Sequence, residues 1–153
     1  MGRYRRILLA TDFSLPSRDA FVAAVNRARD DGATLLMVNV VEPLAMGFSD
    51  VSGDERLLER LSDESIELLE YWMSEARQRG VADVRCLQLT GNAWREIVDA
   101  ARREGADLII LGTHGRSGLY HLLLGSVAEK VVQHAPCSVL VARPRVKTEA
   151  AVS

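Results

Sequence analysis

The stretch that decides the fold runs from Ala106 to Ser126 and reads "ADLIILGTHGRSGLYHLLLGS". Its first six residues are mostly apolar, and a run of this length and composition indicates a buried strand. A loop with four glycines follows, and Ser126 begins a pattern with the spacing of a helix. The stretch therefore predicts a strand, a glycine-rich loop and a helix, and we expect the same succession of strand and helix before and after it.

The rest of the chain alternates between strand and helix patterns in the same way. Apolar or alternating runs predict five strands, at residues 5–11, 33–41, 83–89, 106–111 and 136–144. Helical periodicity predicts four helices between them, at residues 16–32, 54–79, 93–104 and 126–135. Strict alternation indicates an α/β domain with an open, parallel, five-stranded sheet and helices on both faces, for which we expect the Rossmann-like strand order 3-2-1-4-5.

The first three predicted helices each have an apolar face that we expect to point into the core. Asn92 is a predicted N-cap of the third helix, and glycines at positions 32, 80 and 105 follow the helix ends. The residues predicted to face inward are Phe21, Val22, Val25 and Ala28, then Leu57, Leu58, Leu61, Leu68, Leu69, Trp72 and Ala76, and finally Ile97, Val98 and Ala101.

The composition is that of an ordinary globular domain. The chain has 153 residues, 48% of them hydrophobic and 26% charged, with a formal net charge of −2. A slightly acidic chain gives no general reason to expect nucleic-acid binding, and no apolar run approaches the ~20 residues of a membrane helix. Cys86 and Cys137 form no CxxC motif, which favours reduced thiols. We expect a cytoplasmic protein with one domain over residues 1–144, a polar tail over 145–153 and no signal peptide.

Three loops are the places to expect a ligand. In open parallel sheets, ligands bind beyond the carboxyl ends of the strands, near the point where the strand order reverses. The loops at this point follow the first, second and fourth strands, and they begin at Thr11, near Val40 and at Gly112.

The glycine-rich loop after the fourth strand has the features of an anion site. Glycine lets backbone N–H groups approach an anion, and the unpaired N–H groups at a helix N-terminus favour negative charge. The hydroxyl of Ser126 could donate to the same anion. However, Ser126 and Glu129 also fit the S-x-x-E capping box, in which Ser126 would cap its own helix. The residues alone leave these two interpretations balanced.

The best-known nucleotide and catalytic motifs are absent from the sequence. It contains no G-x-x-x-x-G-K-[ST] loop, no G-x-G-x-x-G motif at the first helix and no G-x-S-x-G elbow. His114, His121 and His134 do not have the spacing of metal ligands. These absences exclude a Walker-type NTPase, a dinucleotide-binding fold and an α/β-hydrolase as leading interpretations.

The spacing Gly112-x2-Gly115-x9-Gly125-Ser126 resembles the G-x2-G-x9-G-[ST] motif of the universal stress protein family, in its ATP-binding branch. Asp12 at the end of the first strand, "VNVVEP" at 38–43 and the block over 91–118 are similar to the family as well. The resemblance extends over residues 5–144 and implies a fold of the adenine nucleotide alpha hydrolase type.

The resemblance also implies roles for matching positions. Asp12, with its neighbours, would lie against adenine and ribose, and the backbone of Val40 would bind the adenine edge. Arg116 would supply positive charge to the phosphates, although an exposed arginine is an equally good interpretation. The implied nucleotide-binding residues are Ala10, Thr11, Asp12, Val40, Leu111, Gly112, His114, Gly115, Arg116, Gly125, Ser126 and Val127. Two positions depart from the family pattern: Asn39 stands where His is frequent, and Ala93 where Pro is.

The function that the resemblance implies is that of an ATP-binding, stress-responsive regulatory module with slow hydrolysis or none. ATP with Mg²⁺ is the expected ligand, with AMP or a cyclic nucleotide as alternatives. The sequence leaves two other functions open, a weak ATPase or nucleotidyl-transfer enzyme and a nucleotide-free interaction module. The family also implies a homodimer formed through the fifth strand, with Val139 and Val141 near the two-fold axis.

Overall fold

A computed structural model describes residues 3–43, 55–113 and 124–144 of the chain. The strands are β1 (Arg6–Ala10), β2 (Thr34–Val41), β3 (Val84–Thr90), β4 (Leu108–Gly112) and β5 (Ser138–Ala142). The helices are α1 (Leu15–Asp31), α2 (Glu55–Gln78), α3 (Ala93–Glu104) and α4 (Ser126–His134). Each predicted element is present, and its ends differ from the prediction by at most two residues.

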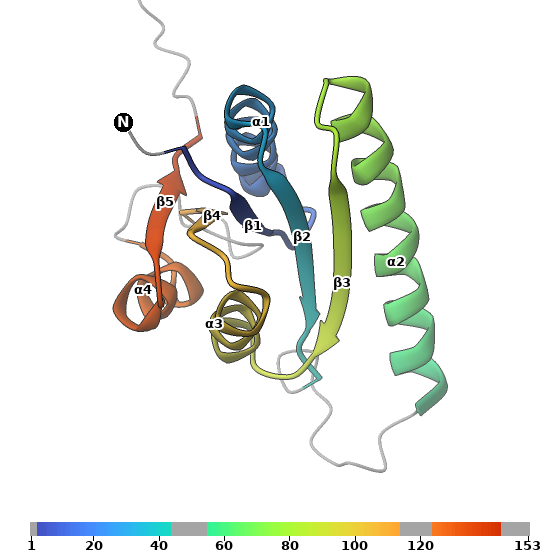
Figure 1. Cartoon of the computed structure of the whole chain (residues 1–153). Helices are drawn as coiled ribbons and strands as arrows, with labels where there is room; N and C mark the ends of the chain where they lie inside the picture. The colour runs from blue at the N-terminus through green and yellow to red at the C-terminus, as the bar shows by residue number, and fades with distance from the viewer. Residues whose placement is uncertain (1–2, 44–54, 114–123, 145–153) are drawn as a thin grey trace, which may run out of the picture.

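The five strands form one parallel sheet in the order β3-β2-β1-β4-β5, which confirms the predicted order (Figure 1). β1 is central, and it pairs with β2 on one side and β4 on the other. The chain therefore reverses its direction of progress beside β1. The carboxyl ends of β1, β2 and β4 meet at one edge of the sheet as a result, and this edge is where the sequence predicts a ligand.

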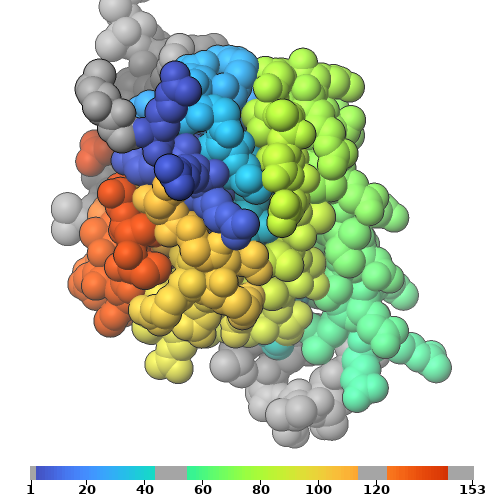
Figure 2. Space-filling view, in the orientation of Figure 1, coloured from blue at the N-terminus to red at the C-terminus, as the bar shows by residue number. Residues whose placement is uncertain are grey.

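The helices cover both faces of the sheet, as predicted. α1 and α2 pack on one face, the face that carries the side chains of Ile7 and Leu9 in β1. α3 and α4 pack on the other face, against Leu8 and Ala10 of the same strand. Successive side chains of a strand point to opposite faces, so a single apolar strand contributes to both halves of the core. In the space-filling view α3 and α4 lie directly against each other, with no gap between their side chains (Figure 2).

Local signals explain where the helices begin and end. Asn92 is the N-cap of α3, as predicted, and accepts a hydrogen bond from the backbone N–H of Arg95. Ser14 caps α1 in the same way, a cap that the sequence analysis did not identify. Gly32 and Gly105 end α1 and α3 with φ values of 66° and 67°, in the left-handed region that glycine adopts without a steric penalty.

The predicted core is correct except along α2. The inward-facing residues of α1 and α3 are buried, apart from the half-buried Val22. In α2, Leu69, Trp72 and Ala76 are buried, whereas the prediction for Leu68 is wrong, since this side chain is 42% exposed. Leu68 adjoins the fully buried Leu69, so it points about 100° around the helix from the face that meets the sheet. α2 is also longer than the strand beside it, because its 24 residues span about 36 Å and the seven residues of β3 span only about 23 Å. The N-terminal part of α2 therefore extends beyond the sheet (Figure 1).

Two further expectations concern thiols and membranes. Cys86 and Cys137 are both free and half-buried, and burial raises the pKa of each thiol, which makes the reactive thiolate scarcer. Across the part of the chain that the structure describes, no helix combines the length and apolar character required to cross a membrane. The expected polar tail, residues 145–153, lies outside the described residues.

Candidate functional site

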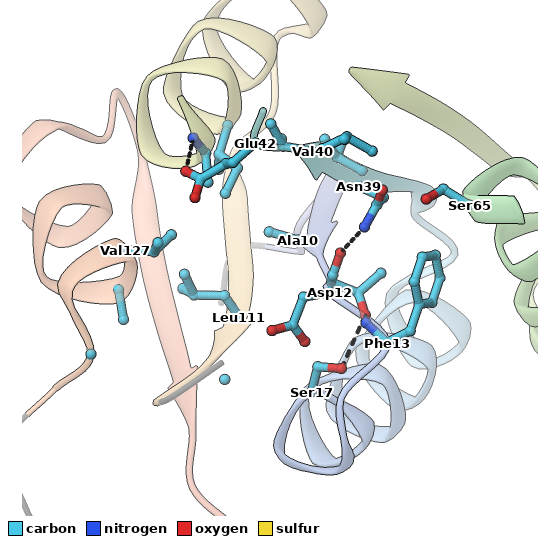
Figure 3. Close-up of a pocket in the computed structure, with 18 of the residues that line it drawn as sticks. Ala10, Asp12, Phe13, Ser17, Asn39, Val40, Glu42, Ser65, Leu111 and Val127 are labelled. Carbon is cyan, nitrogen blue, oxygen red and sulfur yellow. Dashed lines mark hydrogen bonds between the residues drawn. The ribbon is translucent and has the colours of Figure 1, made fainter. Parts of the chain in front are cut away.

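A cavity of about 660 Å³ opens at the carboxyl ends of β1, β2 and β4, beside the N-terminus of α4 (Figure 3). Nine of the twelve predicted site residues line it. They are Ala10, Thr11, Asp12, Val40, Leu111, Gly112, Gly125, Ser126 and Val127. The other three, His114, Gly115 and Arg116, lie outside the described residues. The described residues that were predicted from three separate loops therefore converge on one cavity.

The loop between β1 and α1 is fixed by short hydrogen bonds to side chains. Thr11 Oγ1 accepts from the backbone N–H of Phe13 (3.0 Å) and is 3.1 Å from the Ser17 hydroxyl, itself 2.8 Å from the carbonyl of Ser14. Asp12 Oδ1 accepts from the N–H of Ser14 at 2.9 Å. Phe13 has a φ of 62°, a conformation that a residue with a Cβ adopts only when its surroundings enforce it. These contacts hold the carboxylate of Asp12 on the side of the cavity that faces Leu111 (Figure 3).

The end of β2 presents backbone groups to the same cavity. The last backbone hydrogen bond between β1 and β2 runs from the N–H of Thr11 to the carbonyl of Val38 (2.9 Å). Backbone groups two residues apart in a strand point to the same side, so the N–H and C=O of Val40 also point toward β1. There, however, the chain has already turned away at Asp12. Val40 therefore directs an adjacent donor and acceptor at the cavity that it lines.

Asn39 explains why the sheet does not close over this position. Its Nδ2 donates to the carbonyl of Thr11 at 2.9 Å, so that carbonyl is already paired with a side chain. Asn39 is only 5% exposed, and its Oδ1 is buried with no hydrogen-bond partner among the described residues. A buried acceptor without a partner costs about 1–3 kcal/mol, which is at least as large as the net gain of about 0.5–1.5 kcal/mol from the Nδ2 bond.

The sequence leaves open whether Ser126 caps its own helix, and the structure decides this point. The N-cap of α4 is Gly125, Ser126 is the first helical residue, and within the described residues no side chain caps the helix. The capping-box interpretation is therefore wrong, because its serine would have to stand one position earlier. The N–H of Gly125 donates to the carbonyl of Thr113 at 2.7 Å, which holds the start of α4 beside the end of β4. Ser126 is exposed at this end of the cavity.

The charged side chains of the described cavity wall are all acidic. Asp12, Glu42 and Glu64 line the cavity, and among the described lining residues there is no Lys, Arg or His. Glu42 Oε1 accepts a hydrogen bond from the backbone N–H of Ala93 at 2.5 Å and so satisfies one of the unpaired donors at the start of α3. The described residues contain no cluster of three or more His, Cys, Asp or Glu side chains that could hold a metal ion.

Sequence reasoning missed a second wall of the cavity. The middle of α2 lines it through Leu61, Glu64, Ser65 and Leu68, and the loop residue Phe13 joins them. Nothing in the periodicity of α2 separates residues that face a cavity from residues that face the core. The overhang of α2 beyond the sheet, which depends on the tertiary structure, creates this wall.

Comparison with known proteins places the chain in a family. A sequence model described as the universal stress protein family matches residues 3–143. Universal stress protein MJ0531 of Methanocaldococcus jannaschii is 36% identical over 141 residues, which make up 92% of this chain and 82% of the relative. The solved structure of universal stress protein UspA from Lactobacillus plantarum superposes with a TM-score of 0.81 at 27% identity, covering 94% of this chain and 100% of that one.

A further solved structure shares the fold at a greater distance. It is a universal stress protein from Archaeoglobus fulgidus in complex with dAMP, with a TM-score of 0.69 and 23% identity, covering 93% of this chain and 100% of that one. At this identity the likeness establishes the fold alone. The family match over nearly the whole chain and the 36% identical relative go further, and they show that the chain belongs to the universal stress protein family.

Proposed function

We propose that this chain binds ATP in the cavity at the carboxyl ends of β1, β2 and β4 and acts as a nucleotide-dependent regulatory module. The observation that carries the proposal is the convergence of nine residues, predicted from three separate loops, on one cavity of about 660 Å³. A volume of this size is typical of pockets that enclose small molecules and cofactors.

The two ends of the cavity suit the two ends of a nucleotide. At one end, the N-cap of α4 is a glycine, which has no side chain to accept from the first N–H groups of the helix, and such groups favour phosphate oxygens. At the other end, the backbone of Val40 offers an N–H donor and a C=O acceptor side by side. They match the ring nitrogen acceptor and the amine donor on the edge of adenine. Between them lie the apolar side chains of Ala10 and Leu111, which suit the faces of a base.

Mg²⁺ belongs to the proposal for an electrostatic reason. Three carboxylates line the described part of the cavity without a basic side chain, so a bare triphosphate would meet repulsion rather than compensation. A divalent cation bound to the phosphates would reduce this repulsion, and Arg116, outside the described residues, would add positive charge. We expect ATP to bind more weakly when EDTA removes Mg²⁺. AMP and cyclic nucleotides carry less charge and remain alternative ligands.

Binding, rather than turnover, is the activity that we propose. In-line attack on a γ-phosphate needs a base or a positioned water beside the phosphates. Of the three described carboxylates in the cavity, Glu42 binds the start of α3 and Asp12 is tied into the β1–α1 loop. Glu64 is exposed on α2, on the opposite face of the sheet from α4, so none of the three is placed as such a base. A weak ATPase or a nucleotide-free interaction module would need an observation that favours it, and none of the described contacts does.

A homodimer through β5 is the second part of the proposal. β5 is an edge strand of the sheet, and its residues Val139 and Val141 are only half-buried in the single chain. An apolar edge strand is prone to pair with another chain. Sedimentation at micromolar concentration should therefore give the mass of two chains, and a single chain would contradict the proposal.

The nucleotide proposal can be tested with a pair of matched variants in α4. Val127 lines the cavity, whereas Val132 on the same helix is 48% exposed and does not line it. Val127→Trp should fill the part of the cavity beside the start of α4 and lower the affinity for Mg-ATP by tenfold or more in equilibrium dialysis, whereas Val132→Trp should leave it unchanged. Equal affinity in both variants would show that ATP, if bound, lies elsewhere.

A further inference from the structure

We propose that Glu42 selects the nucleobase by accepting a hydrogen bond from the exocyclic amine of adenine. This inference rests on the proposed function, since it assumes that a nucleotide occupies the cavity, and it adds a residue that determines which base is bound. Glu42 is not among the residues that the family motif implies. It stands out for its place in the fold.

The position of Glu42 follows from the geometry of β2. It lies two residues beyond Val40, directly after the end of β2. Its side chain reaches the start of α3, the helix on the sheet face against which Val40 packs, and both residues line the cavity. Figure 3 shows the Glu42 carboxylate close to Val40 and above Ala10 and Val127 in the view, at the end of the cavity that adjoins α3. Glu42 is half-buried, so its carboxylate is partly shielded from water and a hydrogen bond to it gains strength.

The hydrogen bonds of Glu42 leave room for a ligand. Oε1 accepts from the N–H of Ala93 at 2.5 Å, which fixes the orientation of the carboxylate. This is the one hydrogen bond that Glu42 makes within the described residues. An ionised carboxylate accepts about four hydrogen bonds, so Oε2 remains able to accept from a donor inside the cavity.

The exocyclic amine of adenine has enough N–H groups to bind both acceptors. It carries two N–H bonds: one can reach the carbonyl of Val40 and the other the carboxylate of Glu42. Hypoxanthine has a carbonyl oxygen at this place, which would face the carboxylate acceptor to acceptor. A site built to bind a donor rejects an analogue that lacks it, because its own polar groups are then left unpaired.

The other acidic side chains of the cavity are less suited to this task. Asp12 Oδ1 is bound by the N–H of Ser14, and in Figure 3 Asp12 lies beside Leu111, away from Glu42. Glu64 is exposed on α2, on the face of the sheet opposite to α3. Of the three, Glu42 is the carboxylate that shares the side of β2 on which the Val40 side chain lies.

The test compares ATP with ITP, which carries hypoxanthine in place of adenine, in the presence of Mg²⁺. The decisive variant is Glu42→Gln. Its carbonyl oxygen can still accept from the N–H of Ala93, so α3 keeps its contact, while its NH₂ group replaces the free carboxylate oxygen. The expected wild-type preference is tenfold or more for ATP over ITP, and Glu42→Gln should lower this ratio by tenfold or more. Asp99→Asn makes the same chemical change on the outer face of α3, where the Asp99 side chain is 61% exposed, and should leave the ratio unchanged.

The outcomes separate the two proposals. Part of the wild-type preference comes from the backbone of Val40, because hypoxanthine also differs from adenine at N1. That part is the same in both proteins, so the change in ratio isolates Glu42. An ATP:ITP ratio that stays within twofold in Glu42→Gln would overturn the inference and leave ATP binding standing. A wild-type protein that binds neither nucleotide would overturn the proposed function, and the inference with it.

Discussion

The substitution Asn39→Asp tests the hydrogen bond that positions the loop after β1. Asn39 is 5% exposed and donates from Nδ2 to the carbonyl of Thr11 at 2.9 Å. An ionised carboxylate at this position would face that carbonyl acceptor to acceptor, away from water. A protonated carboxyl group, in contrast, has an O–H that could take over the amide's role. We therefore expect the variant to be folded at acidic pH and destabilised at neutral pH.

The magnitude follows from the burial. Full burial raises the pKa of a carboxyl group by about 3–5 units, and each unit corresponds to 1.36 kcal/mol. The folded variant would hold a proton that the unfolded chain releases near pH 4, so its stability falls as the pH rises above that value. The total loss is about 4–7 kcal/mol once the pH exceeds the folded-state pKa. A loss of this size is comparable to the whole stability of a small domain.

Urea denaturation between pH 4 and pH 8, followed by circular dichroism, measures this loss. The matched control is Asn26→Asp, the same change at an exposed position of α1, which should shift the free energy of unfolding by no more than about 0.5 kcal/mol. At pH 4, Asn39→Asp should lie within about 1 kcal/mol of the wild type. A difference between variant and wild type that does not change with pH would refute the reasoning.

Two other predictions concern stability. Arg18 Nη2 donates a hydrogen bond to Glu75 Oε1 at 2.7 Å, and this bond lowers the pKa of Glu75. Its contribution to stability is therefore present above pH 4.5 and is lost as the pH falls through the folded-state pKa. In Glu75→Gln, the free energy of unfolding should therefore fall less steeply between pH 4.5 and lower pH than in the wild type. An unchanged pH dependence would contradict the role of the Arg18–Glu75 contact. In α2, Leu69→Ala should cost about 2–5 kcal/mol and Leu68→Ala under 1 kcal/mol, because the first side chain is fully buried and the second is 42% exposed; equal losses in thermal unfolding would show that the two faces are misassigned.

Periodicity predicted the elements and the meeting of their loops, because both depend on short-range pattern and on a general rule for parallel sheets. It could not predict contacts between residues that are distant in the sequence, and it could not place the first residue of a helix to within one position. Ser126 and Glu129 satisfy the pattern of a capping box, yet the helix begins one residue earlier than that pattern needs, with Gly125 as the cap. The bond between Glu42 and Ala93 joins residues 51 positions apart, and no local signal marks it.

The end of β2 is held in place by side chains that bind segments distant in the sequence. Asn39 and Glu42 both use a side chain to bind the backbone of a neighbouring segment, Asn39 the loop after β1 and Glu42 the start of α3. Val40 lies between them with its backbone directed at the cavity. Each of the two side chains therefore sets one boundary of the space beside Val40. A change at either position would alter the site through the placement of its walls, even if that side chain never touched the ligand.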